Sequence, residues 1–503
     1  MDFETRTTDF LRQSVDGICR QEQTQEVIVP DSDPDASRIL YCCAQAVVRS
    51  KTCAAGSIQI AGGVQICALY ACEADEIARA VDAYLPFTLR LDHPAAGEDT
   101  QALLDCRVCT ADARLVNSRK ILFRAEVGAQ ILGYSPASAD IPLLKDTPKG
   151  LQLRCRTYPL RLPAETAEKS FLLSEELALP AGQIAAEKIA AMSVLPEITE
   201  QRLIGNKAVF KGTMQVQILY FAADHSLNRF SQSLPFSQYC QLQADYDEDA
   251  IQILPLVTGC DAQLLTPSGA AGFLLSVNLL AQCLVWKTVT RTFCEDAFAT
   301  RGELKPEWYE CTFDCLLDRK TQTLPLREAI RSEALRSVVD STLFVDFPRA
   351  ERTPQGLRIT IPASVRILGT DAEGALCGAA GNLEAAAELP AGDGTNCLVL
   401  AQQEPDGYAA PAPGGAEVRG GIMLDICTSA EQTFRTLSGG SIEPPPDETV
   451  RRPSVVLRAV PSGTQVWALA KEYRTDLAAI CAANALNGEE TETDGMLLIP
   501  MGQ

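Results

Sequence analysis

One stretch of alternating apolar and polar residues recurs three times along the chain. In its clearest copy, Gly212 to Tyr220, apolar residues stand at every second position, which is typical of a strand with one buried face. The copy from Gly62 to Tyr70 lies 150 positions earlier and keeps the Gly-to-Tyr spacing and the phase. A third, Ala363 to Gly369, ends 149 positions after Tyr220, with Gly in place of Tyr. A repeat of this length indicates successive copies of one folding unit.

The residues after each strand repeat as well. A polar turn is followed by Leu85-Pro86 in the first copy, Leu234-Pro235 in the second and Leu389-Pro390 in the third. This order predicts a hairpin whose return strand opens on the proline, since a strand end tolerates the missing N–H. Another predicted strand pair follows, Val108 to Val116 with Leu122 to Leu132 in the first copy. The sequence therefore predicts a mainly β chain with three β-rich units.

The last fifty residues follow a different pattern. Val466, Leu469, Ala470 and Tyr473 fall at the i, i+3, i+4 and i+7 spacing of one helix face. A second apolar helix face, Leu477 to Cys481, comes directly after the helix-start signal Thr475-Asp476. Gly463 ends a strand before the first helix, and a second strand closes on Leu498-Ile499-Pro500. These signals predict a small α+β unit of order strand, helix, helix, strand, with Trp467 and Tyr473 in its core.

This order of elements resembles LysM domains, which bind N-acetylglucosamine polymers or sometimes a protein partner. In that fold the ligand groove lies between the loop after the first strand and the loop before the second. The resemblance implies that the groove is formed by Ser462, Gly463, Thr464, Gln465, Val466, Leu486, Asn487 and Gly488. These residue types leave open whether a sugar or a protein loop binds there.

The repeated strand carries a second resemblance. Val216 to Tyr220, followed by Leu234 to Ser237, is similar to the SPOCS domain of endospore-forming bacteria. Three SPOCS-like units followed by one LysM domain resemble the SipL-type family of spore-envelope assembly. This resemblance implies a non-enzymatic adaptor, located in the mother-cell cytoplasm at the outer forespore surface. Its LysM domain would bind the morphogenetic ATPase that polymerises into the coat basement layer. The alternative is a LysM protein that binds peptidoglycan or another N-acetylglucosamine polymer.

These patterns divide the chain into five parts. They are an N-terminal segment at 1–20, SPOCS-like β domains at 21–140, 166–300 and 315–440 (the last divergent), and a LysM domain at 454–501. Proline-rich stretches at 135–165 and 441–453 are interpreted as linkers. The spacing of Phe3, Phe10, Leu11, Val15 and Ile18 predicts a short helix at the N-terminus.

Composition excludes several kinds of partner. The net charge of −21, from 44 Lys and Arg against 65 Asp and Glu, argues against nucleic acids and anionic membranes, because both require clustered cations. No stretch is apolar for the roughly 18 residues that span a bilayer, and the charged start Met1 to Arg6 is unlike a signal peptide. The 19 cysteines are scattered within apolar runs, which favours a reducing cytoplasm over a disulfide framework.

The residues that usually carry catalysis are scarce. The two histidines, His93 and His225, stand in predicted loops, and no phosphate-binding, metalloprotease or serine-hydrolase motif is present. The pairs Cys106 and Cys109, and Cys311 and Cys315, fall in different predicted units, so they lack the second pair that a structural zinc needs. We therefore expect no enzyme activity, no cofactor and no metal, with these thiols in the core.

Overall fold

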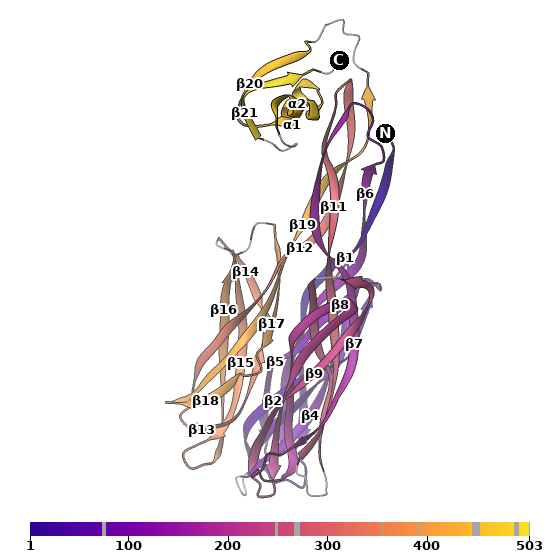
Figure 1. Cartoon of the computed structure of the whole chain (residues 1–503). Coiled ribbons are helices and arrows are strands. Elements are labelled where there is room, and N and C mark those ends of the chain that lie inside the picture. The colour runs from indigo at the N-terminus through magenta and orange to yellow at the C-terminus, as the bar shows by residue number, and fades with distance from the viewer. Residues whose placement is uncertain are drawn as a thin grey trace.

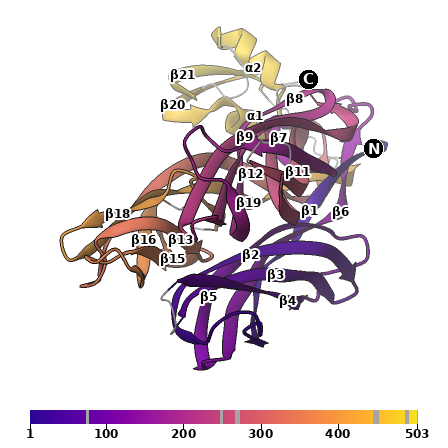
Figure 2. The same cartoon turned by 90° about the horizontal axis from the view of Figure 1, so that it is seen from below.

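The computed structural model describes residues 1–72, 77–246, 250–265, 272–354, 356–390, 392, 394–444, 453–486 and 492–501. Most of these residues lie in antiparallel strands, so the prediction of a mainly β chain is confirmed. The strands build three two-sheet sandwiches, and a small unit with two helices follows at the C-terminal end (Figure 1). Viewed from below, the three sandwiches are grouped around a common centre (Figure 2).

The first sandwich packs a sheet of order β1-β6-β5 against a sheet of order β2-β3-β4. Inward side chains of both sheets, such as Ile58, Ile60, Phe123 and Val127, form one buried core between them. Its strands are β1 (Phe3–Ile28), β2 (Ala36–Ala54), β3 (Ser57–Cys72), β4 (Ala78–Asp92), β5 (Gln101–Asn117) and β6 (Lys120–Leu144).

The second sandwich has the same plan with one strand fewer, because β8 spans the positions of β2 and β3. A sheet of order β10-β11-β7 faces the pair β8-β9. Phe210, Val216, Phe273 and Leu279 belong to the core between these sheets. The strands are β7 (Leu151–Ala178), β8 (Ala186–Ala222), β9 (Leu227–Tyr246), β10 (Ala250–Leu264) and β11 (Gly272–Ala299).

The third sandwich repeats the plan with more interruptions. The sheet β12-β19-β17, extended by β18, faces the sheet β13-β15-β14, extended by β16, and Ile359, Val365 and Leu424 belong to its core. The strands are β12 (Glu303–Arg331), β13 (Ser337–Val345), β14 (Arg349–Thr353), β15 (Gly356–Thr370), β16 (Leu376–Leu389), β17 (Asn396–Gln403), β18 (Tyr408–Ala412) and β19 (Gly415–Glu443).

The three repeated stretches occupy matching positions. They lie on β3, β8 and β15, and each pairs with the following strand.

The prediction that the prolines open the return strands is wrong for the first two copies. Pro86 pairs with Gly63 and Pro235 with Thr213, both well inside β4 and β9. Both are edge strands, where alternate N–H groups point away from the ladder and a proline removes no bond.

The third Leu-Pro pair is not the counterpart of the other two. Val216 pairs with Gln232, and the matching Val365 pairs with Gly381. Two positions further along β16, Leu383 therefore takes the place of Leu234, and Leu389 lies at the end of that strand.

The predicted N-terminal helix is wrong, because Phe3–Ile28 is one long strand paired with β6. A bulge between Gln13 and Val15 shifts the phase of the strand. Phe10 and Leu11 both become buried although they are neighbours, since they join different cores. Their adjacency and the phase shift together imitate helical spacing.

The first predicted linker is also wrong, because residues 135–165 contain the end of β6 and the start of β7. Beyond Tyr134, β6 pairs only with β1, and such a ribbon edge accommodates prolines. Of the second predicted linker, 441–453, residues 445–452 lie outside the described part of the chain.

The long strands continue past the sandwiches as three ribbons that pack together. The ribbons β1/β6, β7/β11 and β12/β19 share a core that includes Phe10, Phe293 and Phe313. The rings of Phe293 and Phe434 stack at 4.5 Å, which joins β11 to β19. The sandwiches are therefore held together by a common hydrophobic stem. Neither helix among the described residues has the length and apolar character needed to cross a membrane.

Equivalent polar side chains also link the sandwiches in a cycle. Gln282 of β11 makes two hydrogen bonds to the backbone of Leu104 in the first sandwich, at 2.9 and 2.8 Å. Gln130 of β6 donates to the carbonyl of Val399 in the third sandwich. Asp425 of β19 accepts from Gln252 in the second sandwich at 2.7 Å. Each sandwich thus uses the same position to bind the corresponding strand of a neighbour, which is β5, β17 or β10.

Candidate functional site

The C-terminal unit folds in the predicted order of strand, helix, helix and strand. It consists of β20 (Val455–Gln465), α1 (Val466–Tyr473), α2 (Leu477–Asn484) and β21 (Glu492–Pro500). The buried side chains of α1 include Val466, Leu469 and Ala470, as the helical spacing predicts. Asp476 caps α2 by accepting a hydrogen bond from the N–H of Ala478 at 2.9 Å.

One asparagine fastens the second helix to the sheet. The Asn484 side chain donates to the carbonyl of Leu498 at 2.6 Å and accepts from the N–H of the same residue at 2.8 Å. It also donates to the carbonyl of Ile480 within its own helix. These bonds fix the spacing between α2 and β21, and therefore the shape of the unit.

The structure places the predicted groove residues in different environments. Ser462, Gly463 and Gln465 are exposed at the end of β20, where the pairing with β21 shifts between Val460 and Thr464 and Gly463 has φ +83°. Thr464 is half-buried, and its hydroxyl donates to the carbonyl of Pro461 at 2.7 Å. This end of β20 thus offers short polar side chains, which suit hydrogen bonding to a ligand.

The other predicted groove residues contribute less accessible surface. Val466 is completely buried, so its side chain is part of the core and cannot form a wall of a groove. Leu486 is half-buried and packs against that core. Asn487 and Gly488 lie outside the described residues. Among the groove residues that the structure describes, the accessible part is therefore the end of β20, just before α1.

The helical side of the unit docks on the tip of the β7/β11 ribbon. The indole Nε1 of Trp467 donates to Asp296 of β11 at 2.8 Å, and the ammonium of Lys471 approaches the same carboxylate at 2.6 Å. The Trp467 ring meets Phe298 edge-on, with ring centroids 5.1 Å apart. The guanidinium of Arg154 lies over the Trp467 ring, 5.8 Å from its centroid, as a cation–π contact.

Two more bonds complete the docking. Arg474 donates to the carbonyl of Gly302 at 3.2 Å, and the N–H of Leu477 donates to Gln152 at 3.4 Å. Burial raises the pKa of the Asp296 carboxyl, but the hydrogen bonds from Lys471 and Trp467 outweigh it, so this pKa lies below its ordinary value. The ionised carboxylate is therefore the form that holds the unit in place.

Sequence reasoning placed Trp467 in the core of the C-terminal unit, and it is 3% exposed. Part of that burial comes from Phe298, which belongs to the second sandwich. Tyr473, also expected in the core, is half-buried, and its hydroxyl accepts a hydrogen bond from Arg458 at 2.9 Å. No local signal could have revealed the docking, because its two sides are 171 positions apart.

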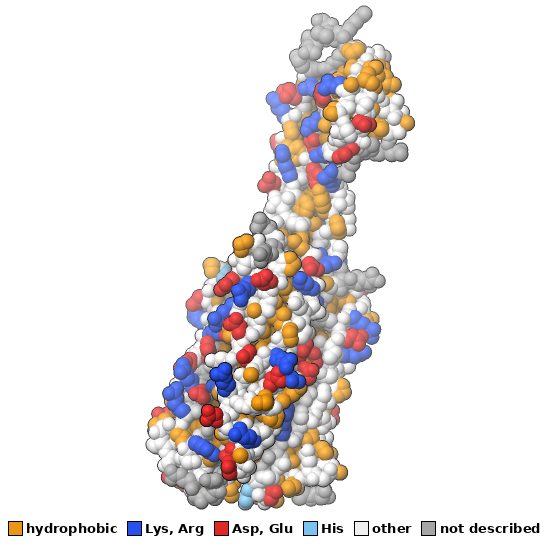
Figure 3. Space-filling model, turned by 90° about the vertical axis from the view of Figure 1, so that its left-hand side faces the viewer, with side chains coloured by type: hydrophobic (Ala, Val, Ile, Leu, Met, Phe, Trp, Pro, Cys, Tyr) orange, Lys and Arg blue, Asp and Glu red, His pale blue; other side chains and the backbone are white. Residues whose placement is uncertain are grey.

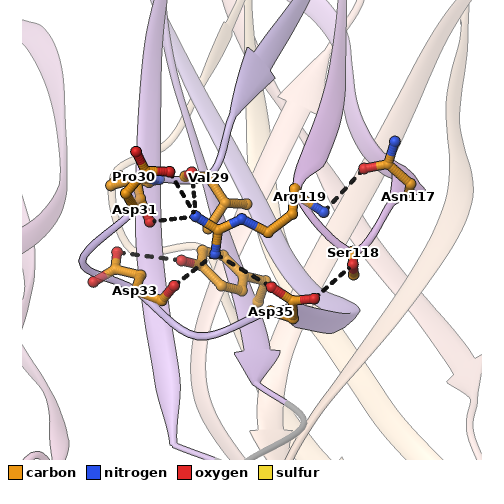
Figure 4. Close-up of polar contacts among 9 residues, drawn as sticks. Val29, Pro30, Asp31, Asp33, Asp35, Asn117, Ser118 and Arg119 are labelled. Atoms are coloured by element: carbon orange, nitrogen blue, oxygen red, sulfur yellow. Dashed lines mark hydrogen bonds and ion pairs between the residues drawn. The ribbon is translucent and has the colours of Figure 1, made fainter.

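A second polar cluster lies in the first sandwich, where the loop between β1 and β2 meets the turn between β5 and β6 (Figure 4). The guanidinium of Arg119 donates to carbonyls of the loop between β1 and β2, at Val29, Pro30 and Asp33. It also pairs with the carboxylates of Asp31 and Asp35 at 3.3 Å. Arg119 provides the positive charge that balances Asp31 and Asp35 of this acidic loop. The cluster therefore serves to hold the loop in place.

The tyrosine that ends the repeated stretch supports the same loop. Tyr70 donates to Asp33 at 3.3 Å, and the equivalent Tyr220 donates to Gln183 at 3.3 Å in the second sandwich. Both tyrosines are completely buried. The repeated tyrosine therefore serves to fix the loop between the first two strand positions of the first and second units.

The thiols and imidazoles are not gathered into a site. Cys109, Cys311 and Cys315 are buried and Cys106 is half-buried. His225 is exposed in the turn between β8 and β9, as predicted, and His93 is half-buried in a loop. Within the described residues no three His, Cys, Asp or Glu side chains are placed as metal ligands.

Comparison with known proteins finds one family match, which lies within the second sandwich. Residues 185–264 match the family model described as SipL, SPOCS domain. This span covers β8, β9 and β10 and leaves out the long strands β7 and β11. No curated protein and no solved structure matches the chain. Residues 185–264 are thus similar to a SPOCS domain of the SipL type, which is consistent with a SipL-type protein.

Proposed function

We propose that this protein is a non-enzymatic adaptor of spore-envelope assembly. The three sandwiches, formed by β1 to β6, β7 to β11 and β12 to β19, are its SPOCS-like platform. The C-terminal unit at 454–501 is a LysM domain that contacts its partner. That partner is the morphogenetic ATPase of the coat basement layer, and the adaptor tethers it to the outer forespore surface in the mother-cell cytoplasm.

The observation that carries the proposal is the fixed presentation of the C-terminal unit. Trp467, Lys471 and Arg474 fasten its helical side to the tip of the second sandwich's ribbon. The unit is thereby held beyond the three sandwiches, at one end of the molecule (Figure 1). An adaptor needs such an arrangement, because one part must face the partner while the rest remains free to attach elsewhere.

Two further properties support this role. The SPOCS match lies in the second of three sandwiches that share one plan, so the same architecture is present three times. Most of the 19 cysteines are buried. A chain rich in buried thiols fits the reducing mother-cell cytoplasm.

The proposal is tested by affinity capture from a lysate of a sporulating bacterium. The bait is the full-length chain, and the comparison is a chain that ends at residue 444, checked by circular dichroism for its β structure. We expect the basement-layer ATPase to co-purify with the full-length chain alone. Recovery of N-acetylglucosamine polymers in place of the ATPase would favour the alternative of a sugar-binding LysM protein. Equal recovery of the ATPase by both chains would move the contact into the sandwiches and contradict the proposal.

A further inference from the structure

The two-stranded sheet of the C-terminal unit has one covered face and one open face. Val460, Leu497 and Ile499 turn inward and are buried against the helices. The outward positions hold large apolar side chains that remain exposed: Val455 is 52% exposed, Leu457 59%, Met496 60% and Leu498 43%. Hydrophobic side chains gather on this unit at the tip of the molecule in Figure 3.

Strand register joins these side chains into one surface. Leu457 pairs with Leu498 and Ala459 with Met496, while Val455 lies opposite Pro500. Side chains of paired residues lie about 5 Å apart on the same face. Val455, Leu457, Ala459, Met496 and Leu498 thus form a continuous apolar strip, here called the outer sheet face. An exposed strip of this kind marks an interaction site more often than scattered single residues do.

The docking of the unit leaves this face free. The polar contacts with the second sandwich come from Trp467, Lys471, Arg474 and the N–H of Leu477, all on the helical side. The helices lie between the sheet and the β11 tip (Figure 1). The outer sheet face is therefore directed away from the second sandwich, on which the helices dock.

The charges beside this face have one sign. Glu492 and Asp494 are exposed on β21 beyond Gly495, where the pairing with β20 shifts and Gly495 has φ +83°, so they lie past one end of the apolar strip. Arg458 is the one cation in the two strands. It turns to the helical side, where it binds Tyr473 and lies 3.6 Å from Glu472. The apolar strip consequently ends in two carboxylates without a neighbouring cation on the same strands.

The apolar strip and the carboxylates beside it indicate which kind of partner fits this face. A second copy of the chain would bring the same carboxylates and another net charge of −21, which repel. A neutral sugar polymer needs hydrogen-bonding groups, and aliphatic side chains offer none. A protein surface with an apolar centre and Lys or Arg at one rim is complementary in both respects.

We propose that the outer sheet face is the surface by which the C-terminal unit binds a cation-rimmed apolar patch on its protein partner. This inference rests on the proposed function for the existence of that partner. It assigns the contact to the face opposite the docked helices and distinguishes it from the end of β20 at Ser462 to Gln465.

The experiment titrates the purified coat basement-layer ATPase with the full-length chain and three variants. The first variant is Leu457→Ser with Leu498→Ser, and the second is Glu492→Gln with Asp494→Asn. The third, Leu172→Ser, is the matched control, because Leu172 is 58% exposed on β7, within the second sandwich. All changes are at exposed positions, and thermal unfolding checks that each variant is folded.

We expect the serine pair to weaken binding by about tenfold or more, as loss of apolar residues at an interface centre does. The amide pair should weaken it at low salt and less at high salt, because ions screen exposed charges. The control should bind like the unchanged chain.

If the unchanged chain binds and both double variants bind equally well, this inference is wrong while the proposed function stands. If the unchanged chain does not bind the ATPase, both are wrong. If sedimentation shows dimers that the serine pair abolishes, a second copy occupies the face and the inference is overturned.

Discussion

Trp467 and Asp296 join the C-terminal unit to the second sandwich through a hydrogen bond of 2.8 Å between the indole Nε1 and a carboxylate oxygen. The same carboxylate receives Lys471 at 2.6 Å. One aspartate on β11 therefore organises the contact that orients the whole unit. Its removal has consequences that can be measured in the full-length chain.

Asp296→Ala should loosen the docked unit. Trp467 and Lys471 lose their common acceptor, and the docking free energy should fall by about 1–2 kcal/mol, since the ion pair is partly exposed. Hydrogen exchange of α1 should become faster, and the indole emission should shift to longer wavelength. Asp92→Ala, at an exposed carboxylate paired with Arg90, should change neither signal. Unchanged exchange in α1 would show that Phe298 and Arg154 hold the unit without Asp296.

Docking should also depend on pH. The pKa of Asp296 is lowered in the folded chain, so its contribution is present above the ordinary aspartate pKa of about 3.9 and is lost as pH falls through the folded value. The emission of Trp467, isolated by comparison with Trp467→Phe, should be constant near neutral pH and change only below about pH 4. Asp296→Ala should lack this acid transition. A transition of the same size in that variant would assign it to other carboxyl groups.

Gln282→Leu should destabilise the assembly of the sandwiches. Gln282 is completely buried and satisfies both the N–H and the carbonyl of Leu104. Leaving both groups unpaired should lower the free energy of unfolding by about 2–4 kcal/mol. Denaturant unfolding followed by circular dichroism measures this loss. The exposed change Gln322→Leu serves as control, and an equal effect of the two changes would contradict the role of the cyclic contacts.

The repeated glycine should be intolerant of a side chain. A Cβ at Gly212 would lie 2.2 Å from the carbonyl oxygen of Glu197, and one at Gly62 would lie 2.3 Å from that of Val47. Because both obstacles are backbone atoms, Gly212→Ala should cost about 2 kcal/mol or more. Gly407→Ala, where the nearest atoms would be 3.7 Å away, should be tolerated. Equal melting temperatures for the two variants would show that β8 can move away from its own N-terminal half.

Local patterns were sufficient to predict the elements that depend on neighbouring residues. The alternation at Gly212 to Tyr220 predicted a strand, and the spacing of Val466, Leu469 and Ala470 predicted α1. The N-terminal strand was missed because the bulge at Gln13 breaks the alternation. The prolines of 135–165 suggested a linker because a ribbon edge tolerates them as well as a loop does.

The site was less predictable than the fold. The docking of Trp467 on Asp296 depends on two segments that no sequence pattern relates. The outer sheet face was within reach of sequence reasoning, since Val455, Leu457 and Ala459 alternate on one strand. Alternation alone does not say which face is buried, however, and here the helices cover the opposite one.

The most direct test of the account is hydrogen exchange of the full-length chain with and without the basement-layer ATPase. The account predicts new protection confined to residues 453–501, strongest in β20 and β21, with the three sandwiches unchanged. Protection that appears in the sandwiches and spares the C-terminal unit would contradict the claim that this unit is the contact module.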